Sequence, residues 1–171
     1  MTHAAQHSYK IQLTLPTEEA TTHIASRISE MLTIGDTLLI SGPIGAGKTH
    51  FCRTLIQSRL RSEGRMEEVP SPTFTLVQIY DLNNVEIWHA DLYRVTNPDG
   101  VMELGLGDAF ETAICLVEWP DRLGPEQPRS ALSLEIAAGK GENSRVATFS
   151  ASSPRWAPVF ALLTTIQANL E

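Results

Sequence analysis

Residues 37–49 read TLLISGPIGAGKT: a short apolar run passes directly into a glycine-rich loop that ends in Lys48 and Thr49. The loop fits the pattern G-x-x-x-x-G-K-[ST] at every defined position. Glycines in such a loop allow backbone torsions that turn successive N–H groups inward onto a polyphosphate. The sequence therefore predicts that Lys48 reaches the β- and γ-phosphates of a nucleotide and that the Thr49 hydroxyl binds Mg²⁺.

The segments on either side of this loop supply a context that a chance match usually lacks. Residues 37–41 are almost wholly apolar, as expected of a strand that is buried on both faces of a parallel sheet. Residues 49–60 place apolar side chains on one face of a helix, whose N-terminal dipole favours bound phosphate. An ordinary flexible turn with one exposed lysine is the alternative. The residues expected to contact the nucleotide here are Gly42, Gly45, Ala46, Gly47, Lys48, Thr49 and His50.

The hydrophobic pattern of the whole chain predicts an α/β fold. A helix is expected from about Thr17 to Gly35, a short helical patch after Pro98, and a C-terminal amphipathic helix from Ser153. Besides residues 37–41, strands are expected at 73–80, 85–92, 113–117, 132–136 and 145–149. We therefore expect residues 1–171 to form a single P-loop NTPase-like domain with a central, mainly parallel sheet, antiparallel additions and helices on both faces.

The composition is that of an ordinary globular protein, with 42% hydrophobic and 19% charged residues. A net charge of -7 argues against direct gripping of bare nucleic acid, because few cations are available to release counterions from phosphates. The N-terminus lacks an apolar signal core, and no stretch approaches the ~20 apolar residues of a membrane span. Cys52 and Cys115 are expected to be buried, reduced thiols. These features predict a cytoplasmic protein with no membrane role.

Two carboxylates are placed where a nucleotide-bound Mg²⁺ needs a further anchor, at the carboxyl ends of neighbouring strands. Asp91 ends the apolar face that strand alternation assigns to Ile87 and His89. Glu118 directly follows the apolar strand at 113–117. Both acids are therefore candidates for binding the metal or positioning water. A helix cap or a solvated surface acid is the alternative for either residue.

Thr73, His89, Arg94 and Trp119 each have a functional and a structural interpretation. The Thr73 hydroxyl is a candidate for contacting the γ-phosphate or its metal, as a switch threonine does, but Ser-Pro-Thr is also an ordinary entry into a strand. His89 is a candidate catalytic residue or a core histidine. Arg94 is a candidate for neutralising phosphate or for pairing with an acid, and Trp119 for covering a nucleobase or for packing. The residues alone favour the structural interpretation of Thr73, His89 and Trp119.

Five short motifs follow one another along the chain: residues 45–49 (GAGKT), 71–74 (SPTF), 89–94 (HADLYR), 104–106 (LGL) and 117–120 (VEWP). Together they resemble the TsaE family, the small bacterial P-loop ATPases of tRNA threonylcarbamoyladenosine synthesis. The resemblance runs from about Leu15 to Trp119. The P-loop is shared by very many families, whereas HADLYR followed by VEWP is far more restrictive and carries the resemblance.

This resemblance implies a protein that binds ATP and Mg²⁺, associates with TsaB and TsaD, and meets tRNA only indirectly through them. It implies catalytic roles for Lys48, Asp91 and Glu118, metal binding by Thr49 and both acids, a switch role for Thr73 and a place near the nucleotide for Trp119. Which acid binds Mg²⁺ directly stays open. The family often has an acid where this chain has Pro43, and a small hydroxyl residue where it has His50.

The sequence is compatible with three functions. An ATPase working within a tRNA-modifying complex, slow until its partners supply missing groups, fits the small number of arginines near the loop. A small P-loop kinase usually needs an arginine-rich lid, and none is visible in the sequence. An ATP-controlled binding module without essential hydrolysis would share every binding residue with the ATPase. The adenine pocket is not identified, and the segment near Thr17 and the strand near Leu132 are its possible walls.

Overall fold

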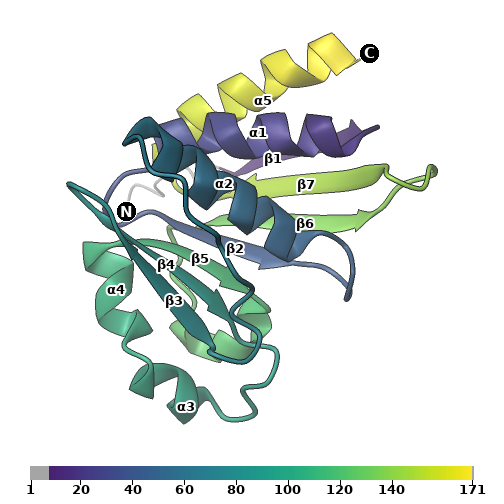
Figure 1. Cartoon of the computed structure of the whole chain (residues 1–171). Coiled ribbons are helices and arrows are strands. Elements are labelled where there is room, and N and C mark those ends of the chain that lie inside the picture. Colours follow the sequence, from purple (N-terminus) through teal and green to yellow (C-terminus); the bar gives the residue numbers. More distant parts are fainter. Residues whose placement is uncertain (1–7, 171) are drawn as a thin grey trace, which may run out of the picture.

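A computed structural model describes residues 8–170, and it shows one seven-stranded sheet flanked by helices (Figure 1). The elements are β1 (Tyr9–Leu15), α1 (Glu18–Met31), β2 (Thr37–Ser41), α2 (Lys48–Ser62), β3 (Val77–Asp81), β4 (Glu86–Asp91), α3 (Pro98–Glu103), α4 (Leu106–Thr112), β5 (Ile114–Glu118), the 3-10 helix η1 (Pro120–Glu126), β6 (Leu132–Ala138), β7 (Arg145–Ala151), the 3-10 helix η2 (Pro154–Trp156) and α5 (Ala157–Leu170).

The strands lie in the order β1-β7-β6-β2-β5-β4-β3. The central strands β6, β2, β5 and β4 are parallel, whereas β1 and β7 at one edge and β3 at the other pair antiparallel with their neighbours. The predicted sheet with antiparallel additions is therefore confirmed. The connections that leave β2 and β5 run to opposite faces of the sheet, which opens a crevice at the carboxyl ends of these strands. The glycine-rich loop begins at that end of β2.

Helices cover both faces of the sheet, as the sequence predicts. In Figure 1, α1, α2 and α5 lie above the sheet, while α3 and α4 lie below it. Alternate residues of β2 enter the two resulting cores, because successive side chains of a strand point to opposite faces. Leu38 and Ile40 pack in the core under α1, α2 and α5, and Leu39 packs in the smaller core over α3 and α4. None of the helices within residues 8–170 is long and apolar enough to cross a membrane.

The structure differs from the sequence expectations in four segments. The strand expected at 73–80 begins only at Val77, because Leu76 adopts a left-handed φ of 70° and its N–H donates to the Pro72 carbonyl, which closes a turn. Residues 9–15, to which the sequence analysis assigns no element, form edge strand β1. Residues 106–112, where two glycines suggested only punctuation, form α4. Helix α1 is capped by Thr17 as predicted, but it ends at Met31 rather than near Gly35.

Candidate nucleotide-binding site

The glycine-rich loop between β2 and α2 has the backbone conformation that its glycines permit. Gly45 and Gly47 adopt φ values of 81° and 104°, in the left-handed region that L-residues rarely enter. Gly42 faces β6 so closely that a Cβ there would overlap the carbonyl oxygen of Ile136. Gly47 is the residue that precedes α2, so the first backbone N–H groups of that helix lie at the end of the loop. This is the backbone arrangement that binds phosphate.

Lys48 folds its side chain back along this loop. Its ammonium donates to the carbonyl oxygens of Gly42 (2.7 Å) and Pro43 (2.8 Å), and it lies 4.4 Å from the centroid of the Trp119 ring. Burial lowers the pKa of Lys48, although the negative charges of Glu118 and Asp91 oppose this shift. The ammonium is therefore a desolvated cation held by neutral oxygen atoms, which phosphate oxygens can replace.

Asp91 and Glu118 end the neighbouring parallel strands β4 and β5, where they are direct partners in the sheet register. Their side chains are almost completely buried, with 5% and 1% of each residue exposed. Each carboxylate accepts a hydrogen bond from a threonine hydroxyl: Thr49 donates to Glu118 over 2.8 Å, and Thr73 donates to Asp91 over 3.2 Å. Thr73 lies in the turn that precedes β3, beside the site.

His89 is buried, as its structural interpretation predicts, but it also contacts the site. Strand alternation puts it on the same face of β4 as Asp91, and its Nε2 lies 2.7 Å from Glu118 Oε2. Cys52 of α2 lies above them, and one ligand atom from each of Cys52, His89 and Glu118 falls within 4.8 Å of the others. Burial raises the pKa of the Cys52 thiol well above its ordinary value, with Glu118 and Asp91 adding to the shift. The contact between His89 and Glu118 accounts for two of these three groups as a hydrogen-bonded pair, and we assign no metal to this cluster.

A cavity of about 380 Å³ opens over these groups. It is lined by Ile44, Gly45, Gly47, Lys48, Thr49, His50, Thr73, Asp91, Tyr93, Glu118 and Trp119. The structure therefore brings most of the predicted site residues together, including both acids and Thr73. Gly42 and Ala46 do not line this cavity: Gly42 packs against β6, and Ala46 faces the other side of the loop.

Trp119 and Tyr93 form an aromatic wall of this cavity. The chain turns sharply after β5, where Trp119 adopts a left-handed φ of 59°, and the two rings lie 4.9 Å apart. Strain of this kind costs of order 1–3 kcal/mol and is often found at functional sites. Arg94 does not line the cavity. Its guanidinium instead lies 5.3 Å from the ring of the exposed Phe74.

A second cavity, of about 200 Å³, lies on the other side of the loop. Its walls come from the first turn of α1 (Glu18 and Thr21), from Ile136 of β6 and from the hairpin residues Asn143 and Arg145. Gly47 and His50 line both cavities, so the two hollows meet at the start of α2.

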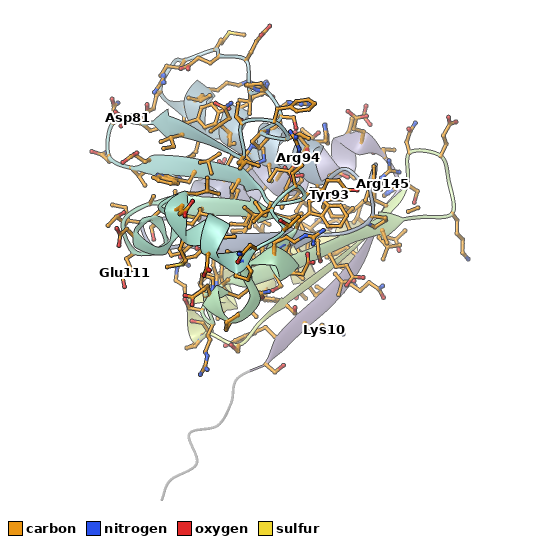
Figure 2. The ribbon with its side chains drawn as sticks, turned by 90° about the horizontal axis from the view of Figure 1, so that it is seen from below. Lys10, Asp81, Tyr93, Arg94, Glu111 and Arg145 are labelled. Carbon is orange, nitrogen blue, oxygen red and sulfur yellow. The ribbon has the colours of Figure 1, made fainter. Side chains whose placement is uncertain are left out.

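Arg145 is a residue of this second cavity that the sequence analysis missed. Its Nε donates to the Ala46 carbonyl (2.9 Å) and its Nη1 to that of Ser144 (2.9 Å), so the first residue of β7 holds the glycine-rich loop. Within residues 8–170, no carboxylate forms an ion pair with Arg145. Figure 2 shows Arg145 and Tyr93 on one side of the molecule, opposite Asp81 and Glu111. No local motif marks Arg145, because its partner is 99 residues away.

The donor atoms around the first cavity suit Mg²⁺ better than a softer metal. Thr49, Asp91 and Glu118 offer hydroxyl and carboxylate oxygens, which are the ligands that a hard, oxygen-preferring cation takes together with phosphates. The loop, the buried lysine and the acids at the crevice therefore define a P-loop nucleotide-binding protein.

Comparison with known proteins identifies the family within this class. Residues 15–147 match the model of the family described as "Threonylcarbamoyl adenosine biosynthesis protein TsaE". The chain belongs to the TsaE family.

Relatives and a solved structure agree with this assignment. The tRNA threonylcarbamoyladenosine biosynthesis protein TsaE of Rickettsia conorii is 39% identical over 108 residues, which span 63% of this chain and 60% of that protein. The protein of the same name from Nostoc sp. is 33% identical over 138 residues, 78% of this chain and 81% of its own. The crystal structure of Bacillus subtilis YdiB superposes with a TM-score of 0.72 at 26% identity, covering 94% of this chain and 98% of that one.

Proposed function

We propose that this protein is the ATP-binding and ATP-hydrolysing component of tRNA threonylcarbamoyladenosine synthesis, acting with TsaB and TsaD in the cytoplasm. Membership of the TsaE family and the names of the relatives support this assignment. The observation that carries the ATPase proposal is the convergence of Lys48, Thr49, Asp91 and Glu118 on one cavity beside the glycine-rich loop. Such a site needs only to bind the nucleotide, neutralise charge and position water.

The triphosphate is proposed to lie in the first cavity. Its oxygens would replace the Gly42 and Pro43 carbonyls at the Lys48 ammonium, and would accept from the backbone N–H groups at the start of α2. Thr49, Asp91 and Glu118 are proposed to hold Mg²⁺, which when bound neutralises charge on the β- and γ-phosphates. Glu118 already accepts from Thr49, which favours Glu118 as the acid that orients the metal-binding hydroxyl or an attacking water.

The nucleoside is proposed to occupy the second cavity. The two hollows share Gly47 and His50, so one nucleotide can extend from one to the other across the start of α2. The walls at Glu18 and Ile136 belong to α1 and β6, the two regions that the sequence analysis names as possible walls for the base, which supports this placement. The guanidinium of Arg145, which has no ion pair within residues 8–170, adds positive charge on the same side of the loop.

Slow hydrolysis by the isolated chain is part of the proposal. Arginine side chains that stabilise the transferring phosphoryl group accelerate such reactions strongly. In the described chain none lines the first cavity: Arg94 covers Phe74, and Arg145 holds the loop from the other side. A partner that supplies or orders the missing charge would therefore raise the rate. The net charge of -7 also favours contact with tRNA through TsaB and TsaD rather than directly.

The experiment compares ATP turnover by the purified protein with and without purified TsaB and TsaD, together with tRNA modification in the reconstituted mixture. Stimulated turnover and modification are expected for the wild type. Glu118→Gln should keep nucleotide binding but lose both, whereas Glu86→Gln, which changes an exposed acid at the far end of β4, should behave as the wild type. A lack of stimulation would contradict the proposal. Modification that survives Glu118→Gln would favour an ATP-controlled binding module, and ADP formation that depends on an added acceptor would favour a kinase.

A further inference from the structure

His89 lies one layer behind the proposed nucleotide site. It is fully buried in β4, where it is the register partner of Leu116 and lies two residues before Asp91 on the same face. It does not line the first cavity, so it has no access to a bound nucleotide. Among the described residues, the one polar contact of its side chain is the 2.7 Å hydrogen bond between its Nε2 and Glu118 Oε2. Any effect of His89 on the reaction must therefore pass through Glu118.

The surroundings of His89 Nδ1 determine which atom is the donor in the hydrogen bond between His89 and Glu118. Nδ1 is buried and has no hydrogen-bond partner in the described chain. A proton on that nitrogen would be a buried N–H donor without an acceptor, which is more costly than an acceptor left unpaired. The proton therefore belongs on Nε2, where Glu118 accepts it.

The two carboxylate oxygens of Glu118 accept hydrogen bonds from two different residues, His89 and Thr49. Oε2 accepts from His89, and Oε1 accepts from Thr49 over 2.8 Å. The Lys48 ammonium is close enough for Glu118 to affect its pKa, yet Lys48 and Glu118 form no ion pair in the described chain. A glutamate has several rotatable bonds, so an Oε2 without a donor would turn toward that cation.

We propose that His89 is a positioning residue: it holds Oε2 of Glu118 so that the carboxylate stays off Lys48 and keeps Oε1 on the Thr49 hydroxyl. Lys48 then remains available to phosphate, and Glu118 presents one defined oxygen to the cavity. The inference rests on the proposed ATPase function for its kinetic consequence, but its structural consequence can be measured without turnover.

Two amide variants separate positioning from simple packing. In His89→Gln the side-chain amide nitrogen can reach the place of Nε2, whereas in His89→Asn the amide lies near the place of Nδ1 and falls short of Glu118. His89→Leu removes the donor and keeps an apolar side chain. Ile87→Ala is the matched control, because Ile87 is buried on the same face of β4 two residues earlier.

The rate of ATP turnover should separate these variants. In the TsaB- and TsaD-stimulated assay, kcat should fall roughly 10- to 100-fold in His89→Asn and His89→Leu, the range typical for loss of a residue that orients a metal-linked ligand. His89→Gln should recover most of that loss. The Kd for ADP should change less than about threefold in all three variants, because the phosphate-binding loop is intact. Ile87→Ala should lower the melting temperature without lowering kcat.

Crystal structures of the variants test the placement of Glu118 independently. The distance of 2.8 Å between Thr49 Oγ1 and Glu118 Oε1 should persist in His89→Gln and be lost in His89→Leu, with Glu118 turned onto Lys48. An unchanged carboxylate in His89→Leu would overturn the inference, as would equal kcat values for His89→Gln, His89→Asn and the wild type. If the wild type itself shows no turnover with TsaB and TsaD, the proposed function fails, and the Glu118 position in the variants still decides the role of His89.

Discussion

The hydrogen bond from Arg145 to the Ala46 carbonyl predicts that the hairpin of β6 and β7 stabilises the glycine-rich loop. Arg145→Ala removes the hydrogen bonds to the carbonyl oxygens of Ala46 and Ser144, each with a donor–acceptor distance of 2.9 Å. A hydrogen bond to a charged group contributes about 1.5–3 kcal/mol to stability. Arg145 is only partly buried, so water can replace part of this interaction, and we expect a loss near 1.5 kcal/mol.

This loss has a thermal and a binding consequence. At roughly 2–4 °C per kcal/mol for a domain of this size, the melting temperature should fall by roughly 3–6 °C. A loop that is no longer held must be ordered when the nucleotide binds, so the Kd for ADP should rise about tenfold, the equivalent of about 1.4 kcal/mol. Arg145→Lys should lie between the variant and the wild type, because one ammonium lacks the fork that reaches both carbonyls.

Differential scanning calorimetry measures the first effect and isothermal titration with ADP measures the second. Arg61→Ala is the control, because Arg61 is an exposed arginine of α2 and its removal changes the net charge by the same amount. The reasoning is refuted if Arg145→Ala and Arg61→Ala have the same melting temperature and the same affinity for ADP. A drop in melting temperature without any change in affinity would limit Arg145 to a structural role.

Further outcomes are expected at the loop and in the core. Gly42→Ala should abolish ADP binding, measured by titration, because the added Cβ would overlap the Ile136 carbonyl. The control is Gly64→Ala, at a glycine with a left-handed φ and open space around it. This variant should retain ADP binding and lose about 1 kcal/mol of stability. Burial raises the pKa of Cys115 to about 12, so its thiol should resist alkylation at pH 8 until the chain unfolds. Because the unfolded chain releases that proton first, the free energy of unfolding should fall as the pH rises from about 9 to about 12, and denaturant titrations should show a smaller fall in Cys115→Ala. Equal slopes in the two proteins would contradict this account.

The residues of the proposed nucleotide site lie together, and they are hydrogen-bonded to one another or to their own loop. Lys48 is held by carbonyls of its own loop, and both acids accept from threonine hydroxyls. A nucleotide with its cation would exchange these short hydrogen bonds for contacts with phosphate and metal, while the sheet that carries the acids stays rigid.

Local sequence patterns were sufficient for the loop and for most of the elements around it. The torsions of Gly45 and Gly47 and the strand and helix beside them depend on neighbouring residues, so a short motif predicts them. Alternation along a strand likewise predicted that His89 and Asp91 share a face. Strand β1 also carried a signal in the alternation of Ile11, Leu13 and Leu15, which is the period of a strand with one exposed face, but the sequence analysis assigned no element there.

The sequence by itself determined the class of site that is proposed: a glycine-rich loop of the kind that binds phosphate, followed by a lysine and a threonine. Only the tertiary structure decided which side chains surround that loop. Asp91 meets Glu118 because β4 and β5 are parallel neighbours in one register, and His89 reaches Glu118 for the same reason. Arg145 meets Ala46 because β7 returns beside β6. Such contacts depend on strand order and register, which are selected by burial over the whole sheet and leave no mark within a few residues of either partner.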